Sequence, residues 1–152
     1  MSERDFSAVQ VALRPDLKDL SSSDPQAVLI AMLLAIGEGR FADLAQHFTD
    51  DTELHIYGFP AINGSWHGVA AVVAAMAANF SLISQQKSTV EGMIRQGDAL
   101  AIKIRETGKL TGGHSTHLSP YLATGVIWFT FFEGKIRRVE EYLQVVLQPG
   151  ES

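Results

Sequence analysis

Residues 124–146 read TGVIWFTFFEGKIRRVEEYLQVV, and this stretch decides the fold. Two runs rich in β-branched and aromatic residues flank Glu133-Gly134, where glycine tolerates the positive φ of a tight hairpin turn. The first arm is apolar at nearly every position, whereas the second arm interleaves charged and apolar residues. The stretch therefore predicts a long β-hairpin whose first arm is covered on both faces.

The composition limits the kind of protein this can be. The 152 residues fit one domain, and 46% hydrophobic with 19% charged residues is typical of a globular chain. A formal net charge of -5, with no basic cluster longer than Arg137-Arg138, argues against nucleic acid as a partner. Because the sequence has no cysteine, it can form neither disulfides nor thiolate sites.

The ends and apolar runs of the sequence predict a cytoplasmic protein without membrane contact. The first five residues lack the basic start and apolar core of a signal peptide. The longest apolar run, residues 27–36, is too short to span a bilayer.

The order of the remaining patterns predicts helices first and an antiparallel sheet afterwards, which is typical of an α+β fold. Residues 1–22 are expected to form an N-terminal arm, residues 23–148 a single domain and residues 149–152 a tail. The first helix is expected to begin at Ser23, because Ser23 and Gln26 have capping-box spacing and Pro25 suits the first turn.

The other expected elements follow from periodicity and from glycine and proline positions. Helices are expected over residues 23–36, 41–48 and 68–82, and strands over 52–57, 88–95, 99–107 and from about 122 into the hairpin. Residues 108–120, rich in glycine, serine and threonine, are expected to form a mobile loop near a rim, and whether it acts as a lid is left open.

Several short strings, in this order, resemble the nuclear transport factor 2-like superfamily, in its SnoaL-like and ketosteroid-isomerase-like branch. They are GRFADL at 39–44, FTDDT at 48–52, WHGV at 66–69, RETGK at 105–109 and EGKI at 133–136. The resemblance covers about residues 23–146. It implies a cone: a strongly bent antiparallel sheet closed by three helices, as in cystatin-like folds, with an apolar pocket. It also implies a homodimer formed through the outer face of the sheet.

The resemblance carries over little of the isomerase chemistry. Ketosteroid isomerases use a tyrosine and a protonated aspartic acid to hold an enolate, and an aspartate as base. Counting from the shared strings puts these roles at Met32, at Ile56 and at or beside Val126, all of them apolar. Many SnoaL-like relatives end the last strand with Glu-Tyr-x-Asp, whereas this chain has Gln144 in place of the aspartate.

Two residues are the candidate proton-transferring groups. For a two-residue turn, Glu141 lies opposite Val126 and shares the face on which the isomerase acid would sit. The alternative for Glu141 is a cross-strand ion pair with Lys103, Arg105 or Arg138. His55 is a second candidate base, although alternation with the pocket-facing Ile56 favours a helix or the dimer surface as its neighbour.

The ligand pocket is expected to be lined mainly by apolar and aromatic side chains. The expected lining residues are Met32, Ile56, Tyr57, Trp66, Val126, Trp128 and Tyr142. For Trp66 and Trp128, simple core packing is the alternative role. His114 and His117 have no third ligand at metal spacing, so neither a metal nor a cofactor is expected.

These observations lead to two functional hypotheses. The first is a protein that binds a small apolar molecule and acts as an isomerase, cyclase or dehydratase through acid–base chemistry. The alternative is a non-catalytic ligand-binding or dimerisation module of the same fold, suggested by the apolar residues at Met32, Ile56 and Val126.

Overall fold

A computed structural model describes residues 4–12, 23–111 and 118–148. The elements within these ranges are, in chain order, β1 (Arg4–Asp5), α1 (Ser7–Ala12), α2 (Pro25–Gly37), the 3-10 helix η2 (Phe41–His47), β2 (Phe48–Tyr57), β3 (Gly64–His67), α3 (Val69–Ser81), β4 (Ile83–Gln96), β5 (Ala99–Thr111), β6 (Leu118–Phe132) and β7 (Lys135–Leu147). None of the helices in these ranges is long and apolar enough to cross a membrane.

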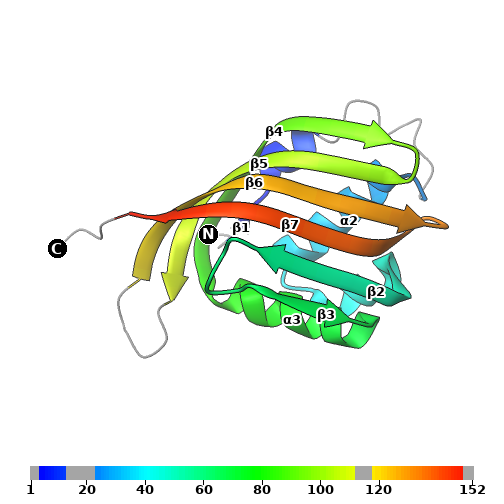
Figure 1. Cartoon of the computed structure of the whole chain (residues 1–152), viewed down its shortest axis with the longest axis horizontal. Helices are drawn as coiled ribbons and strands as arrows, with labels where there is room; N and C mark the ends of the chain where they lie inside the picture. Colours follow the sequence, from blue (N-terminus) through cyan, green and yellow to red (C-terminus); the bar gives the residue numbers. More distant parts are fainter. Residues whose placement is uncertain (1–3, 13–22, 112–117, 149–152) are drawn as a thin grey trace.

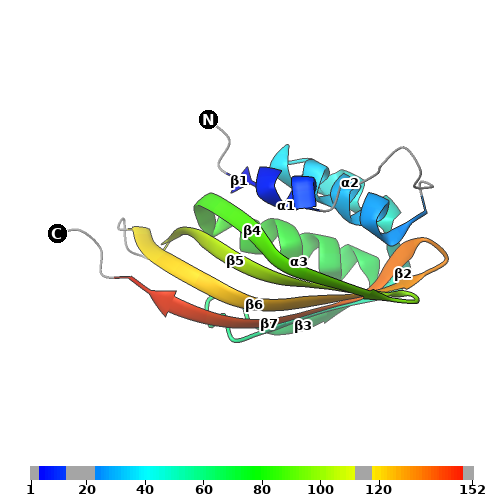
Figure 2. The same cartoon turned by 90° about the horizontal axis from the view of Figure 1, so that it is seen from above.

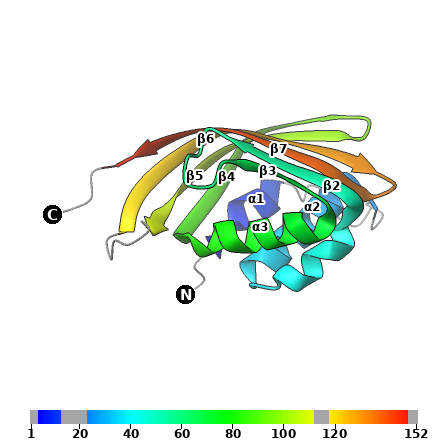
Figure 3. The same ribbon diagram turned by 60° about the horizontal axis from the view of Figure 1, so that its bottom comes forward.

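The strands form one curved sheet in the order β1-β4-β5-β6-β7-β2-β3 (Figure 1). Strands β4 to β7 pair antiparallel with their neighbours, and so do β2 and β3. The β1–β4 and β2–β7 pairs are parallel, so the sheet is mixed rather than wholly antiparallel. The helices lie on one side of it (Figure 2), and the sheet arches over them (Figure 3). This arrangement confirms the predicted α+β class.

The predicted hairpin forms the centre of the sheet. Glu133 and Gly134 have φ values of 49° and 78°, which is the left-handed geometry that a two-residue hairpin turn requires. Beyond the turn the register shifts: Phe131 pairs with Ile136, but Thr130 pairs with Arg138. The second arm therefore carries one extra residue, Arg137, as a β-bulge.

Helix α2 begins slightly later than the sequence predicts. Asp24, rather than Ser23, caps the helix, and its carboxylate accepts a hydrogen bond from the Gln26 backbone N–H at 2.9 Å. Pro25 occupies the first turn, as predicted. Most of the helix surface is buried, because apolar residues surround it on nearly every side.

The N-terminal segment contributes more than an arm. Within the described part, β1 pairs with β4, and Phe6, just before α1, and Val9 of α1 lie in the core with 6% and 2% of their surfaces exposed. Their spacing of three residues puts both on one side of a short helix.

Two stretches of strand go beyond the expected elements. Gly64–His67 forms the edge strand β3, which pairs with β2 just before α3. Residues 108–111 and 118–120, which fall in the loop expected over 108–120, extend β5 and β6 instead. Residues 112–117 of that expected loop lie outside the described residues.

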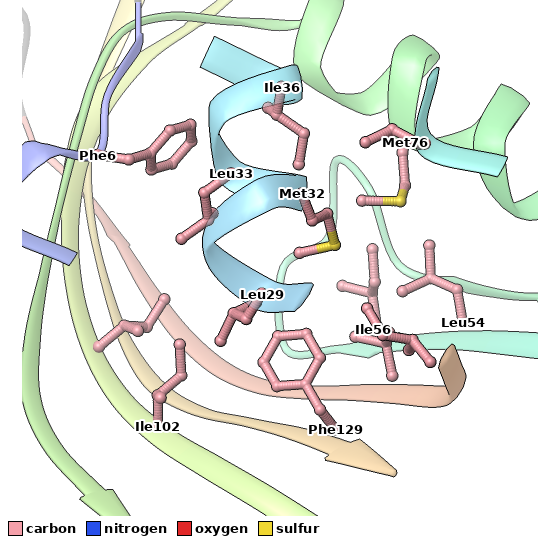
Figure 4. Close-up of a cluster of buried hydrophobic side chains, with 14 of the residues drawn as sticks. Phe6, Leu29, Met32, Leu33, Ile36, Leu54, Ile56, Met76, Ile102 and Phe129 are labelled. Atoms are coloured by element: carbon pink, nitrogen blue, oxygen red, sulfur yellow. The ribbon is translucent and has the colours of Figure 1, made fainter. Parts of the chain in front are cut away.

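The core lies between α2 and the concave face of the sheet. Figure 4 shows α2 directing Leu29, Met32, Leu33 and Ile36 into this space. Residues of β2, β5, β6 and α3 complete the cluster, and the labelled members are Leu54, Ile56, Met76, Ile102 and Phe129.

Candidate active site

A cavity of about 110 Å³ lies in this core, between the helices and the concave face of the sheet. Its wall is mostly apolar, and the residues drawn in Figure 4 around it include Phe6, Leu29, Met32, Ile56, Ile102 and Phe129. Five polar side chains interrupt that wall: Asn79, Gln86, Ser88, Glu106 and Glu141. An apolar cavity with a few polar groups is the usual form of a small-molecule site.

Glu106 is held in this wall by three hydrogen bonds. Its Oε1 accepts from Gln86 Nε2 at 2.8 Å and from Ser88 Oγ at 2.7 Å, and its Oε2 accepts from Tyr121 Oη at 2.7 Å. Only 9% of the Glu106 surface is exposed. Because Glu106 is the acceptor in all three bonds, it behaves here as a carboxylate.

The backbone of β4 is distorted to aim two of these donors inward. The β4–β5 register shifts between Ser84 and Lys87, and Gln85 has a φ of 51°, which is rare for a residue other than glycine. Gln86 and Ser88 then share the concave face with Glu106, which pairs directly with Ser88. A strained backbone beside a polar cluster is common at functional sites.

Tyr121, the third donor, fits against β5 because of a glycine. A Cβ atom added at Gly108 would lie 2.8 Å from both the hydroxyl oxygen and a ring carbon of Tyr121. The ring also packs edge-on against Phe59, with 5.2 Å between ring centroids. Burial, reinforced by the charge of Glu106, raises the pKa of the Tyr121 hydroxyl, so it remains a hydrogen-bond donor.

Glu141 lines the same cavity but has neither the hydrogen bonds nor the charge of Glu106. It lies on β7 opposite Ile127, and among the described residues no hydrogen bond or ion pair satisfies its carboxyl group. Burial, and secondarily the negative charge of Glu106, raises the pKa of Glu141 to about 8. The protonated form therefore predominates at neutral pH.

Two carboxyl groups in one cavity thus have different chemical characters. Glu106 is fixed by its three donors, whereas Glu141 carries a proton that it can transfer. A difference of this kind between two titratable groups is what acid–base sites are built on.

The predicted pocket residues are divided between the two faces of the sheet. Met32 and Ile56 line the cavity. Trp66 packs against the rim of the core and is not part of the cavity wall.

The other four predicted pocket residues lie on the convex face, which is the sheet surface turned away from the helices. Their exposed fractions are 45% for Tyr57, 38% for Val126, 39% for Trp128 and 50% for Tyr142. The bulge at Arg137 explains why Val126 lies outside the pocket, because it pairs Glu141 with Ile127 rather than with Val126. A shift of one residue exchanges the faces of a strand.

His55 also lies on the convex face, because it alternates with Ile56. Its Nδ1 is 2.8 Å from Ser65 Oγ, and its Nε2 is 3.6 Å from Glu53 Oε2. Its ring stacks beside Tyr57 and meets His67 edge-on. The sheet therefore separates His55 from Glu141, and the structure does not bring the two candidates together.

Glu53 and its neighbours form a charged cluster on this convex face. His67 Nδ1 is 2.9 Å and Arg138 Nη1 is 3.3 Å from the Glu53 carboxylate. Glu140 accepts a hydrogen bond from Tyr142 Oη at 2.9 Å. No group of three or more acidic or histidine side chains in the described ranges is arranged to hold a metal ion.

The sequence contains a signal that places Glu106 on the core face of β5. Leu100, Ile102 and Ile104 alternate along β5 and are all buried, and Glu106 continues the same inward series. The period of two thus identifies a carboxylate on the core face. No comparable signal exists for Gln86 or Tyr121, because their positions depend on the bulge and on Gly108.

Comparison with known proteins agrees with this architecture. The family model of the SnoaL-like domain matches residues 29–139. A search among curated proteins finds no match. Many solved structures share the fold, which confirms the predicted resemblance.

Three of these structures show how far the likeness extends. A candidate SnoaL-like polyketide cyclase from Shewanella putrefaciens has a TM-score of 0.70 at 10% identity, covering 90% of this chain and 88% of its own. An NTF2-like protein from Burkholderia xenovorans has 0.63 at 19% identity, covering 77% and 86%. A candidate isomerase from Bacillus subtilis has 0.62 at 16% identity, covering 77% and 84%. At these identities the likeness establishes the fold alone.

Proposed function

Since this chain belongs to the SnoaL-like family, we propose that its cavity binds a small, largely apolar molecule and that Glu141 transfers a proton to it. The reaction class is an isomerisation, a cyclisation or a dehydration. The observation that carries this proposal is the unpartnered carboxyl group of Glu141 in an apolar cavity, with its pKa raised to about 8.

A carboxyl group in this state suits general acid catalysis. An effective catalytic acid has a pKa near the working pH, so that it is protonated before the reaction and still gives up its proton readily. A carboxyl group in water would be ionised at pH 7, and burial is what changes this for Glu141.

The residues at the positions of the ketosteroid isomerase catalytic groups cannot transfer protons, which leaves Glu141 as the candidate acid. Met32 and Ile56 line the cavity but carry no ionisable group, so they cannot transfer protons. Two proteins of the same fold are named as a polyketide cyclase and an isomerase, and both reaction types depend on acid–base steps.

The test compares two glutamates that are adjacent in sequence. Glu141→Gln keeps the shape of the protonated side chain but removes its transferable proton. Glu140→Gln is the matched control, because Glu140 lies on the convex face. Small ketones, alcohols and alkenes are offered to the wild type and to both variants, and products are followed by mass spectrometry. Turnover that Glu141→Gln abolishes and Glu140→Gln retains is expected, and equal turnover by all three proteins would remove Glu141 from the mechanism.

The apolar residues at Met32 and Ile56 also support a second candidate, a binding module without catalysis. In that case compounds bind to the cavity and are recovered unchanged from the wild type and from both variants.

We also propose that the convex face pairs two copies of the chain. Tyr57, Val126, Trp128 and Tyr142 form a partly exposed patch there, and the Tyr57 and Tyr142 rings stack with 5.3 Å between centroids. Charges of both signs border this patch, which suits a two-fold interface in which a surface meets its own copy.

A further inference from the structure

The cavity wall contains the half-buried acid Glu141 but no base to pair with it. Among the described residues that line it, Glu106 and Glu141 are the ionisable ones, and none is lysine, arginine or histidine. Burying a carboxyl group is unfavourable unless it is paired or hydrogen-bonded. Glu141 has neither kind of partner among the described residues.

The hydrogen-bond donors in the cavity wall do not supply a partner for Glu141. Gln86, Ser88 and Tyr121 donate to Glu106 instead. The amide nitrogen of Asn79, which also belongs to the cavity wall, has no partner within the described structure. The chain therefore leaves the place beside Glu141 to a ligand.

We propose that the occupant of the cavity is a small hydrophobic amine, which accepts the proton of Glu141 and is held as an ammonium–carboxylate pair. This inference rests on the proposed function, because it names the group that receives the Glu141 proton. It goes further by giving the chemical class of the ligand and its charge when bound.

The proton transfer balances without any further reactant. When the amine arrives neutral, the O–H bond of Glu141 breaks and the nitrogen lone pair forms a new N–H bond. When it arrives as the ammonium ion, the Glu141 proton passes to water or buffer instead. Both routes leave a carboxylate and an ammonium ion side by side. An alkylammonium ion such as that of lysine has a pKa of about 10.4. Burial lowers the pKa of an amine, but the carboxylates of Glu106 and Glu141 favour its charged form, so nitrogen keeps the proton.

The charges around Glu141 favour this occupant over others. Glu106 on β5 contributes a second negative charge, and Tyr121 on β6 is its neutral donor. The cavity residues of α1, α2, α3, β2 and β4 carry no charge. An ammonium ion is thus attracted, whereas a carboxylate or phosphate group would meet two acidic residues and no compensating cation.

The volume of the cavity limits the size of the amine. At about 110 Å³ it is of the same order as engineered apolar cavities that admit benzene. Cyclohexylamine is therefore a suitable probe, and cyclohexanol and cyclohexanecarboxylate are matched compounds that differ mainly in charge.

Isothermal titration calorimetry at pH 6.5, in two buffers of different ionisation enthalpy, tests the inference. Cyclohexylamine is mostly protonated in solution at this pH, so its binding is expected to displace the Glu141 proton into the buffer. Close to one proton should be released per site, and the affinity should rise roughly tenfold per pH unit up to about pH 8. Cyclohexanol should bind at least roughly tenfold more weakly, and cyclohexanecarboxylate should not bind measurably.

Two variants make the outcome specific. Glu141→Gln should lose amine binding by at least roughly tenfold and keep its affinity for cyclohexanol, which shows that the cavity is intact. Glu140→Gln should bind all three compounds as the wild type does.

The two proposals fail in different ways. If cyclohexanol binds as tightly as the amine, or if amine binding releases no proton, the amine inference is overturned while turnover dependent on Glu141 can still establish the proposed function. If none of the three compounds binds to the wild type, both the amine inference and the binding of small apolar molecules are contradicted.

Discussion

Glu141 links the stability of the protein to pH. Its pKa is raised from 4.5 to about 8 in the folded state, so between these values the folded protein binds more protons than the unfolded chain. This contribution to stability is complete below about pH 4.5 and is lost as the pH rises towards 8. Relative to the wild type, Glu141→Gln should therefore gain about 2–4 kcal/mol between pH 4.5 and pH 8.

Urea denaturation of the wild type and Glu141→Gln at several pH values measures this difference. Glu140→Gln serves as the control, and its difference from the wild type should change little over the same range. A stability difference for Glu141→Gln that stays constant with pH would show that Glu141 is not a buried acid.

Glu106 is expected to tune Glu141 across the cavity. Because the negative charge of Glu106 is the second cause of the raised pKa, Glu106→Gln should lower the pKa of Glu141 below about 8. The pH at which any Glu141-dependent reaction is lost should fall with it, since the acid must be protonated to act. NMR titration of ¹³C-labelled glutamate carboxyl groups measures this pKa shift directly. Tyr121→Phe is the comparison variant, because it removes one hydrogen-bond donor to Glu106 but keeps the charge of Glu106. An unchanged pKa in Glu106→Gln would leave burial as the sole cause.

At the level of elements, the hairpin was predictable and the bulge beside it was not. Glu133-Gly134 between two apolar runs is a local signal for a turn, and the observed φ values confirm it. The extra residue at Arg137 has no local signal, because arginine is compatible with both a regular and a bulged strand. The bulge shifts Glu141 from Val126 to Ile127, so Val126 lies outside the pocket. Tyr142 lies outside it because it follows Glu141 directly on β7 and faces the opposite side.

The hairpin turn also supports the start of α2. A Cβ atom at Gly134 would lie 2.7 Å from the Cβ atom of Ser23, whereas a Cβ atom at Gly97, also at positive φ, would meet nothing within 4 Å. Gly134→Ala should therefore reduce the unfolding free energy by about 2 kcal/mol and Gly97→Ala by about 1 kcal/mol. Chemical denaturation measures both values. Equal losses would mean that the contact with Ser23 is unimportant to stability.

For the whole molecule, the order of elements and the short strings were sufficient to predict the cone. The parallel pairing of β2 with β7 and the packing of Phe6 join residues far apart in sequence, and neither leaves a local pattern. The Glu106 cluster likewise draws on β4, β5 and β6 at once, which is why only its inward alternation was visible in the sequence.

The proposed pairing of two copies can be tested through Trp128, which is 39% exposed on the convex face. Trp128→Lys should weaken self-association by at least roughly tenfold, because it places a charge in the apolar centre of the interface. Leu147→Lys is the control, since Leu147 is 59% exposed at the end of β7 and lies on the face opposite to that of Tyr142. Sedimentation velocity over a range of concentrations distinguishes the two. A wild type that stays monomeric at high concentration would contradict the pairing.

Because β7 lies between β6 and β2, the sheet can close only after β7 has been synthesised. β7 follows every other described strand along the chain, and it carries Glu141. A nascent chain that has not reached Lys135 therefore leaves the facing edges of β6 and β2 without hydrogen-bonding partners, a condition that favours aggregation. During translation, the cavity wall that contains Glu141 and the protection of these edges arise in a single late step.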